Sequence, residues 1–383
     1  MATKNVKVII GSNYGDEGKG KATDYFAHQA YMSGKSCLVV LSNGGSQRGH
    51  TVVLPSGIRH VFRHFGSGSL IGAGTYIPKQ FIVNPMNYAL EFRELNMIGA
   101  RIIPSYINPN CKLTTPFDMI ANQLIEEVRG DAKHGSCGVG IWETILRDGI
   151  TVFEMLQKTV SERVEYLNFV RDGYFSNRIS SKGVKLDKCW SDIIYSKHLI
   201  DNYLYDFDLM MRMSSLADDT VMNDFDTVIF ENGQGLLLDQ NIIGYGKNTT
   251  PSNTGLQNAA EMIRKNFTTD VDVEVCYVSR TYMTRHGAGR FDSEFNKKQE
   301  WIGVDKTNGW NQFQGNFRFG ELDVADLEQR VDEDFHTYGN VDWKKSYFFT
   351  HNDEHELPVS ILKNNYVYTS YGPSRSDVVD VGQ

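Results

Sequence analysis

The sequence predicts an α/β protein with a large central sheet, mostly parallel, that is flanked by helices. Three observations lead to this prediction. Short apolar runs rich in β-branched residues recur from one end of the chain to the other, helix-like segments lie between them, and a glycine-rich turn follows the first run directly. Strands that alternate with helices are typical of parallel sheets covered on both faces.

Five apolar runs are predicted as buried strands, because each is short, rich in β-branched or aromatic residues and bounded by polar ones. They cover residues 6–10, 37–41, 226–230, 273–278 and 346–350. Helical spacing of apolar residues predicts helices over the segments 86–96, 117–128 and 191–213.

The remaining segments indicate the domain organisation. Residues from about 155 to 215 are polar, with helix-like spacing and no strong strand, so we expect a helical insertion there. Residues 292–345 mix glycine, asparagine, glutamine and aromatics without a clear period, which favours long functional loops. No repeat or linker divides the chain, and residues 1–383 are interpreted as a single domain.

The composition excludes several classes of protein. The 47 acidic residues outnumber the 39 lysines and arginines, and a net charge of -8 disfavours a nucleic-acid-binding surface. The five cysteines form no CxxC pair, which argues against a zinc ribbon or a disulfide framework and favours a reducing compartment. No apolar run is long enough for a signal peptide or a membrane span, so we expect a cytoplasmic protein without membrane contact.

The sharpest local signal is the segment that follows the first predicted strand, GSNYGDEGKGKATDYF. Glycines let backbone N–H groups approach phosphate oxygens, and the helix that begins here adds partial positive charge. Lys19 and Lys21 add full charges, so the segment predicts a phosphate site and a P-loop-like fold. The P-loop pattern itself is broken, because Asn13 and Gly20 stand where it requires Gly and Ser or Thr. A turn that only caps a helix is the alternative.

Asp16 is the unusual residue of this turn, because phosphate repels a carboxylate. Its side chain must therefore meet either a metal ion or a proton that has to be removed from a substrate. Further glycine-rich turns occupy 41–53, 134–140, 230–235 and 248–255, and several such turns at strand ends strengthen the prediction of a phosphate-binding site. His50 in the first of them is a candidate acid or phosphate partner, with a structural hydrogen-bonding role as the alternative.

Taken together, the motifs resemble those of the adenylosuccinate synthetase family. The matching segments, in order, are GDEGKGK (15–21), GGSQRGHT (44–51), ENGQG (231–235), TRHGAGRF (284–291) and YGP (371–373). The resemblance implies a homodimeric ligase that joins L-aspartate to C6 of a purine 5′-monophosphate, with GTP and Mg²⁺, through a 6-phosphoryl intermediate. Removal of the N1 proton makes O6 nucleophilic, and phosphorylation makes O6 a leaving group.

The resemblance also implies the role of each matching residue. Asp16 corresponds to the base and, with the carbonyl of Gly49, to a Mg²⁺ ligand, whereas His50 corresponds to the general acid that stabilises the γ-phosphoryl group. Contacts to GTP are implied for Gly15, Glu17, Gly18, Lys19, Gly20, Lys21, Gly49, Thr51, His351, Asp353, Gly372 and Pro373. Contacts to the purine monophosphate are implied for Gln47, Ser136, Cys137, Arg147, Gln234 and Thr250, with Arg147 reaching across from the second subunit.

The base of the triphosphate is expected at THND (350–353), which corresponds to the family's TKxD. A carboxylate accepts both N1–H and N2–H of guanine, so Asp353 favours GTP over ATP. His351 replaces the lysine of the motif. A simple turn after a strand is the alternative interpretation of these residues.

The sequence departs from the family pattern where aspartate should bind. The family's arginine-rich loop corresponds to FQGNFRFGELD (313–323), in which Arg318 is the one remaining arginine. Aspartate brings two carboxylates that need cationic donors, so we expect Arg285 and Arg290 to compensate for the missing ones.

Other departures resemble the phage branch of the family, the 2-aminoadenylosuccinate synthetases, which use dGMP. GSCG (135–138), a glutamine in the remodelled loop and GPxxxDV (372–378) favour that branch, although Asp16 stands where phage members carry serine. We therefore expect dGMP as the substrate, for diaminopurine DNA synthesis, with IMP as the alternative.

Two other classes of function are alternatives to a ligase. A catalytically inactive nucleotide-binding sensor would explain the depleted arginine loop, but decay would not be expected to spare Asp16, His50 and Lys19 together. The broken P-loop pattern disfavours a GTPase or a nucleotide kinase.

Overall fold

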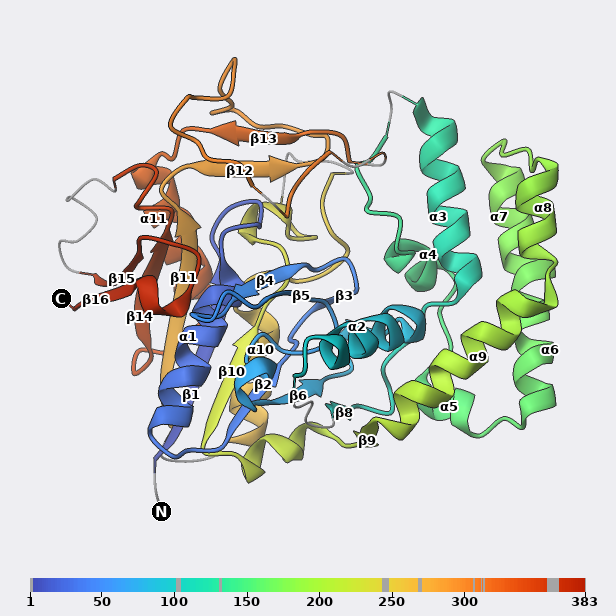
Figure 1. Ribbon diagram of the computed structural model, residues 1–383, viewed down its shortest axis with the longest axis horizontal. Coiled ribbons are helices and arrows are strands. Elements are labelled where there is room, and N and C mark those ends of the chain that lie inside the picture. Colours follow the sequence, from blue (N-terminus) through green and yellow to red (C-terminus); the bar gives the residue numbers. More distant parts are fainter. Residues whose placement is uncertain are drawn as a thin grey trace.

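The computed structural model describes residues 3–100, 105–130, 133–242, 248–267, 271–305, 307–310, 312, 314–356 and 365–382. Its centre is a ten-stranded sheet in the order β16-β15-β14-β11-β1-β10-β2-β6-β8-β9 (Figure 1). The neighbouring strands are parallel throughout, except for β15 and β16 at one edge, which pair antiparallel. The predicted mostly parallel α/β sheet is confirmed.

The strands of the central sheet are β1 (Lys4–Gly11), β2 (Cys37–Val40), β6 (Gly74–Ile77), β8 (Ser105–Ile107), β9 (Ser214–Leu216), β10 (Thr227–Glu231), β11 (Val271–Arg280), β14 (Lys344–Thr350), β15 (Tyr366–Ser370) and β16 (Val378–Gly382). Three two-stranded pairs accompany it: β3 (Gly44–Gly45) with β7 (Phe81–Ile82), β4 (His50–Val53) with β5 (Arg59–Phe62), and β12 (Met283–His286) with β13 (Phe317–Gly320). The helices are α1 (Lys19–Met32), α2 (Pro85–Met97), α3 (Pro116–Arg129), α4 (Ile141–Leu146), α5 (Val152–Leu156), α6 (Val160–Val170), α7 (Ser176–Ser181), α8 (Lys188–Ile194), α9 (Lys197–Arg212), α10 (Gln257–Asn266) and α11 (Val324–Tyr338).

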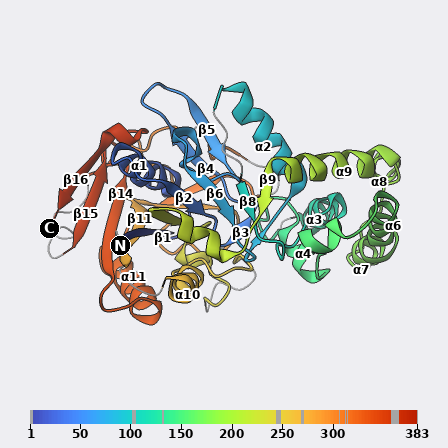
Figure 2. The same cartoon turned by 90° about the horizontal axis from the view of Figure 1, so that it is seen from below.

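Helices cover both faces of the sheet, so its strands are apolar on both sides (Figure 2). Phe26 of α1 packs on one face in a cluster that contains Ile9 of β1. Helices α10 and α11 cover the other face, where Ile263 and Leu327 pack with Val8 of the same strand. The five strands predicted from the sequence all lie in this sheet, and the predicted helices at 86–96 and 117–128 correspond to α2 and α3.

Residues 152–212 form the helices α5 to α9, which stand to one side of the sheet (Figure 1). A π-helical stretch, Arg171–Phe175, joins α6 to α7. The single helix predicted over 191–213 is wrong, because the segment contains the end of α8 and then a separate helix, α9. Ser196 separates them: its backbone is extended and its side chain accepts a hydrogen bond from the N–H of His198, which starts α9.

The prediction of loops throughout 292–345 missed helix α11. Val324, Leu327, Val331 and Phe335 recur at helical spacing, but acidic and polar residues surround them and mask the pattern. Asp323 caps this helix by accepting from the N–H groups of two following residues. Among the described residues, no helix has the length and apolarity that crossing a membrane requires.

Candidate functional site

A cleft of about 1860 Å³ opens at the carboxyl ends of the central strands. The segments that line it follow Gly11 of β1, Glu231 of β10, Arg280 of β11 and Thr350 of β14, four adjacent strands of the sheet. Ligands of open parallel sheets bind at this edge, because the loops that leave the strands meet there. The cleft contains most of the residues that the sequence singles out.

The glycine-rich turn 11–18 runs from β1 into α1 and forms one wall of the cleft. Gly18 precedes the helix with φ of 101°, and a Cβ there would lie 2.8 Å from the Cγ2 of Thr350. The hydroxyl of Thr350 donates to the carbonyl of Glu17, so the end of β14 holds the turn in place. The turn at the N-terminus of α1 therefore has the form of a phosphate-binding loop.

Asp16 sits at the crest of this loop with φ of 58°, a left-handed conformation that non-glycine residues rarely adopt. Its carbonyl accepts a hydrogen bond from Nε of Arg280 at 2.7 Å. Burial raises the pKa of its carboxyl group, while the nearby Lys19 and Arg280 oppose the rise. A carboxylate with a raised pKa that lines a cleft has the properties of a general base.

The side chains of Glu17 and Lys19 are buried beneath the glycine-rich turn. Oε1 of Glu17 accepts from the N–H of Asn13, and Nζ of Lys19 lies 3.7 Å from Oε2 of Glu17. Burial raises the pKa of Glu17 to about 7, and burial lowers the pKa of Lys19. Both residues line the cleft, as predicted for a phosphate site, but neither is open to solvent.

His50 lies opposite the loop, at the start of β4, within a buried cluster of charged groups. Its Nδ1 is 2.7 Å from Oε1 of Glu231, and Nη2 of Arg48 is 2.5 Å from the other oxygen of the same carboxylate. Nδ1 also lies 2.7 Å from Nη2 of Arg48, so Glu231 and Arg48 both contact this nitrogen, and Nε2 takes part in none of these contacts. Burial, aided by Arg48, lowers the pKa of His50 to about 4, so the imidazole is neutral.

Gln47 and Gln234 bring two amide groups together at Gly44. A Cβ on Gly44 would lie 2.9 Å from Nε2 of Gln47 and 3.3 Å from Oε1 of Gln234. Within the described residues, neither amide atom of Gln47 nor Oε1 of Gln234 has a hydrogen-bond partner, although all three atoms are buried. Unpaired buried amides are costly, so this corner of the cleft is suited to a polar, planar ligand.

Ser136 and Cys137 lie on the loop 134–140, which helix α3 holds in place. Asn122 accepts from the hydroxyl of Ser136 at 2.8 Å and from the N–H of Gly140 at 3.2 Å. Glu126, one turn further along α3, accepts from the N–H groups of His134 and Gly135. Thr250 lines the same end of the cleft. The two α3 side chains could not be identified from the sequence, because their role depends on tertiary contacts.

The residues that line the other end of the cleft include His351, Pro373, Tyr282 and Glu354. His351 has φ of 64° and its Nδ1 lies 2.9 Å from the Thr350 hydroxyl. Asp353, the expected partner of the triphosphate base, is exposed and stands outside the residues that line the cleft. Glu354 lines it instead, and accepts a hydrogen bond from the Tyr282 hydroxyl at 2.6 Å.

Lys21 and Gly372 connect the phosphate loop to the segment after β15. Nζ of Lys21 donates to the carbonyl of Gly372 at 2.6 Å and to the hydroxyl of Ser370 at 3.0 Å. Burial lowers the pKa of Lys21 to about 8. Thr51 and Gly49, also singled out by the sequence, line the middle of the cleft.

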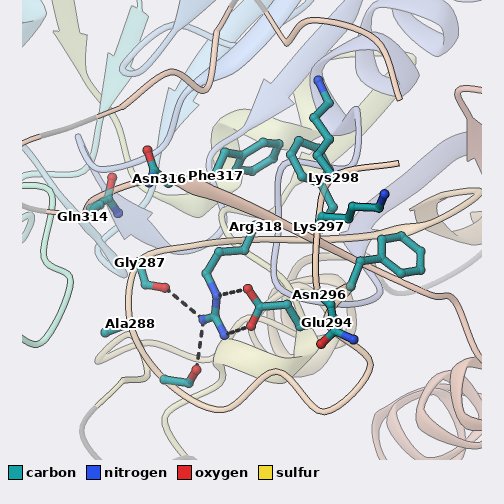
Figure 3. Close-up of a pocket in the computed structure, with 13 residues that line it drawn as sticks. Gly287, Ala288, Glu294, Asn296, Lys297, Lys298, Gln314, Asn316, Phe317 and Arg318 are labelled. Atoms are coloured by element: carbon teal, nitrogen blue, oxygen red, sulfur yellow. Dashed lines mark hydrogen bonds and ion pairs between the residues drawn. The ribbon is translucent and has the colours of Figure 1, made fainter. Parts of the chain in front are cut away.

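The arginines expected to bind aspartate are all engaged with the protein. Arg318 pairs with both carboxylate oxygens of Glu294 and donates to the carbonyls of Gly287 and Gly289, beside a smaller pocket of about 780 Å³ (Figure 3). Arg285 is 1% exposed and donates to the carbonyls of Arg290, Ala288 and Asn248. Arg290 is exposed and pairs with Asp292.

Arg147 also differs from its expected role. Its guanidinium donates to both oxygens of Asp118 at 2.8 Å and to the hydroxyl of Tyr166 at 2.6 Å. The side chain is 5% exposed and these contacts lie within the protomer, so a reach to a second subunit stays a prediction. The buried carboxylate of Asp118 explains these contacts, because it needs a cation in direct contact.

The donor set was considered for Mg²⁺, which the resemblance implies. Within the described residues, no group of three or more His, Cys, Asp or Glu side chains could hold a metal ion. Mg²⁺ does not require such a cage, because one or two carboxylates together with substrate phosphates hold it in most nucleotide sites. The Asp16 carboxylate beside a phosphate-binding loop fits an ion that arrives with a triphosphate.

The fold and the cleft define an α/β protein of the phosphate-binding class, with a carboxylate in the phosphate loop and a histidine opposite it. Comparison of the sequence with known families adds the family itself. The adenylosuccinate synthetase profile matches residues 8–332, and the chain belongs to this family.

Curated relatives agree with this assignment. Adenylosuccinate synthetases from Limosilactobacillus fermentum and Limosilactobacillus reuteri are 27% and 29% identical, over 76% and 75% of this chain. The matches span 65% and 64% of the length of those relatives.

Two solved structures share the fold. Fully ligated adenylosuccinate synthetase from Plasmodium falciparum has a TM-score of 0.70 at 15% identity, covering 98% of this chain and 99% of that one. Cyanophage S-2L succinoaminodeoxyadenylate synthetase, bound to dGMP and to dATP as an energy donor, has a TM-score of 0.63 at 13% identity, covering 100% and 96%.

Proposed function

We propose that the protein is a GTP- and Mg²⁺-dependent ligase that joins L-aspartate to C6 of a purine nucleoside 5′-monophosphate. The observation that carries this proposal is the carboxylate of Asp16, which lies in the phosphate loop, lines the cleft and has a pKa raised by burial. A loop that only bound a triphosphate would gain nothing from an acidic side chain at its crest. A carboxylate at this position can, however, accept a proton from the substrate.

The proposed reaction has two steps. Asp16 accepts the N1 proton of the purine, O6 attacks the γ-phosphorus of GTP, and the bond between that phosphorus and the bridging β,γ-oxygen breaks to release GDP. The amine of aspartate then attacks C6 and phosphate leaves. Mg²⁺, held by Asp16 and the carbonyl of Gly49, would neutralise charge on the phosphate oxygens.

His50 would contact the γ-phosphoryl group through Nε2, because Glu231 holds Nδ1. The imidazole of the protein alone is neutral, since burial lowers the pKa of His50 to about 4. The negative charge of the triphosphate favours the protonated ring, which then donates a hydrogen bond to the transferring group. The Glu231 carboxylate stabilises that imidazolium from behind.

We favour dGMP as the monophosphate, on the strength of the two glutamine amides. Guanine differs from hypoxanthine by the 2-amino group, which adds two hydrogen-bond donors to the edge that carries N1–H. Among the residues that the structure describes, the amide oxygens of Gln47 and Gln234 have no hydrogen-bond partner, and Gln47 is unpaired at both amide atoms whichever way its amide is turned. The cyanophage enzyme that shares this fold was solved with dGMP, which supports the same substrate here.

IMP is the second candidate, because the curated relatives that match are adenylosuccinate synthetases and Asp16 stands where the phage branch carries serine. Ser136, Cys137, Gln234 and Thr250 would bind either monophosphate. We also propose a cytoplasmic homodimer, as the family resemblance implies, although Arg147 would have to leave Asp118 to reach a partner subunit.

Aspartate is proposed to bind between the two pockets. Gln314, Phe319 and the segment 287–288 line both of them. Arg318 is the proposed partner of one aspartate carboxylate, which would take the place of Glu294 on the guanidinium. Nη1 of Arg285 donates to the backbone carbonyl of Arg290, so both arginines belong to the same loop region.

A phosphate-release assay tests the ligase proposal. GTP turnover should require the monophosphate and aspartate together, because the second step alone releases phosphate. GTP hydrolysis without a monophosphate, at the rate of the complete mixture, would refute the ligase and favour a GTPase. Nucleotide binding without any turnover would favour a sensor.

A further inference from the structure

Arg280, at the end of β11, connects the phosphate loop to a distant part of the chain. The side chain is buried, and its three nitrogens all donate. Nε donates to the carbonyl of Asp16 at 2.7 Å, Nη1 to the hydroxyl of Tyr282 at 3.2 Å and Nη2 to Oδ2 of Asp305 at 2.8 Å. The guanidinium thus touches the backbone of the proposed base and one carboxylate.

Asp305 is built to hold that guanidinium. Its Oδ1 accepts from the N–H groups of Thr307 and Asn308, both at 2.9 Å, and its Oδ2 accepts from the side-chain amide of Asn308 at 3.1 Å. Against the effect of burial, Arg280 and these donors hold the pKa of Asp305 well below its usual range. The carboxylate is therefore charged and fixed in orientation.

Thr307, whose backbone N–H donates to Asp305, also contacts the hairpin of β4 and β5. Oγ1 of Thr307 lies 3.1 Å from Oγ1 of Thr51 on β4, and Arg59 of β5 also donates to the Thr307 hydroxyl. Asp305 is therefore anchored on both sides: through Arg280 to the sheet and the phosphate loop, and through Thr307 to the hairpin that carries His50.

Two physical consequences follow for Asp16. Its left-handed backbone is strained for a residue with a side chain, and the bond from Arg280 to its carbonyl helps to hold it there. A buried guanidinium also needs a carboxylate in contact. Without Asp305, the nearby Asp16 would be the alternative partner, and an ion pair with Arg280 would occupy the carboxylate that the substrate proton needs.

We propose that Asp305 is a positioning residue, which acts through Arg280 to hold the Asp16 backbone and to keep the Asp16 carboxylate available to the substrate. This inference rests on the ligase function proposed above. Nothing in the family motifs includes Asp305, and the sequence places it among residues expected to form loops.

The test compares Asp305→Asn with the wild type by steady-state kinetics, with GTP, L-aspartate and the preferred monophosphate. We expect kcat to fall roughly 10- to 100-fold, while KM for GTP and for the monophosphate changes less than about 3-fold, since positioning errors act on the reacting geometry. The double variant Arg280→Gln with Asp305→Asn should be no less active than Arg280→Gln alone, because Asp305 acts through Arg280.

Two further variants separate positioning from stability. Asp305→Glu keeps the charge and should retain more activity than Asp305→Asn, which also covers the case in which Asp305→Asn does not fold. Asp206→Asn, which breaks the Arg93–Asp206 pair between α2 and α9, is the matched control and should leave kcat unchanged.

The outcomes distinguish the two proposals. A wild type that forms no product would refute the ligase and this inference with it. An active wild type with an unchanged kcat in Asp305→Asn would overturn the inference alone, as would a loss confined to KM or a folded Asp305→Glu that is no better than Asp305→Asn.

Discussion

Asp16, in the turn after β1, and Glu231, the last residue of β10, are carboxylates at the ends of neighbouring strands, but their surroundings give them opposite properties. Glu231 contacts Arg48 and His50 and accepts two bonds from Ser67, and despite burial these partners hold its pKa well below the usual range. Asp16 has no such cation in direct contact with its carboxylate among the described residues, and burial raises its pKa. Of the two, only Asp16 is suited to accept a proton.

Asp16→Asn should bind GTP and the monophosphate but lose phosphoryl transfer, because an amide cannot accept the N1 proton. We expect kcat to fall by about 10²- to 10⁴-fold, the usual contribution of a general base. Rapid-quench measurement of GDP formed in a single turnover checks this. Turnover within a few-fold of the wild type would remove Asp16 from the role of base.

His50→Ala should reduce kcat more than KM, since the imidazole is proposed to contact the γ-phosphoryl group most strongly as that group transfers. A loss of about 10²- to 10³-fold in kcat is expected for one preorganised donor. Ser67→Ala is a useful control, because Ser67 contacts Glu231 but not His50 among the bonds described. An effect on KM alone would show that His50 only binds the nucleotide.

At the scale of elements, helix α3 fixes the loop that is proposed to bind the 5′-phosphate. Asn122 and Glu126 each accept two bonds from that loop, and Gln123 donates to the carbonyl of Gly138 at 3.1 Å. The capping box at Thr115 and Asp118 starts the helix at a defined residue, so these side chains face the loop in register.

Asn122→Ala should raise KM for the monophosphate by roughly 5- to 30-fold, because it removes two hydrogen bonds worth about 1 kcal/mol each. KM for GTP should stay the same, since the triphosphate end of the cleft does not touch this loop. Measuring both constants in one series checks the prediction. Equal changes in the two would mean that the substitution disturbs the whole cleft.

The elements also show how far the sequence alone can lead. The central strands were predictable because each is a short apolar run buried on both faces, and the phosphate loop because its glycines and lysines follow such a run. Helix α11 was missed because only one narrow stripe, around Leu327 and Val331, is buried. Asn122, Arg280 and Asp305 could not have been found, because their roles depend on contacts that arise only in the folded protein.

The family motifs predicted which positions carry candidate site residues, but not where the side chains of those residues point. Arg147 and Arg285 match arginines of the motifs, yet both guanidinium groups turn toward partners within the protomer. Asp353 follows a strand as the motif requires, but it is Glu354 that lines the cleft. Side-chain direction depends on which carboxylates and carbonyls need a donor nearby, and a motif does not record that.

At the scale of the whole molecule, buried histidines make stability depend on pH. His64 is fully buried, its Nε2 accepts from the N–H of Asn84, and burial lowers its pKa to about 3. The unfolded chain binds a proton at this residue below about pH 6.5, whereas the folded protein does not. The contribution of His64 is therefore complete above pH 6.5 and is lost as the pH falls toward 3.

His64→Gln removes this dependence, while its amide oxygen can still accept from Asn84. The free energy of unfolding of the wild type, minus that of the variant, should decrease by about 1.4 kcal/mol for each pH unit between about 6 and 4. Urea unfolding at pH 7, 6 and 5 measures this difference, in which other titrating groups such as Glu17 cancel. A difference that is constant with pH would contradict the assignment.

The proposed ligase joins L-aspartate to a purine monophosphate, so its product is a succinyl adduct of that nucleotide. The most direct measurement is mass spectrometry of the products after incubation with Mg²⁺, GTP and L-aspartate, with dGMP, GMP, IMP and dIMP supplied separately. We predict an adduct from dGMP in preference to the other three, with weaker preference in Gln47→Leu. An adduct from IMP alone would correct the substrate, and the absence of an adduct from all four would contradict the account.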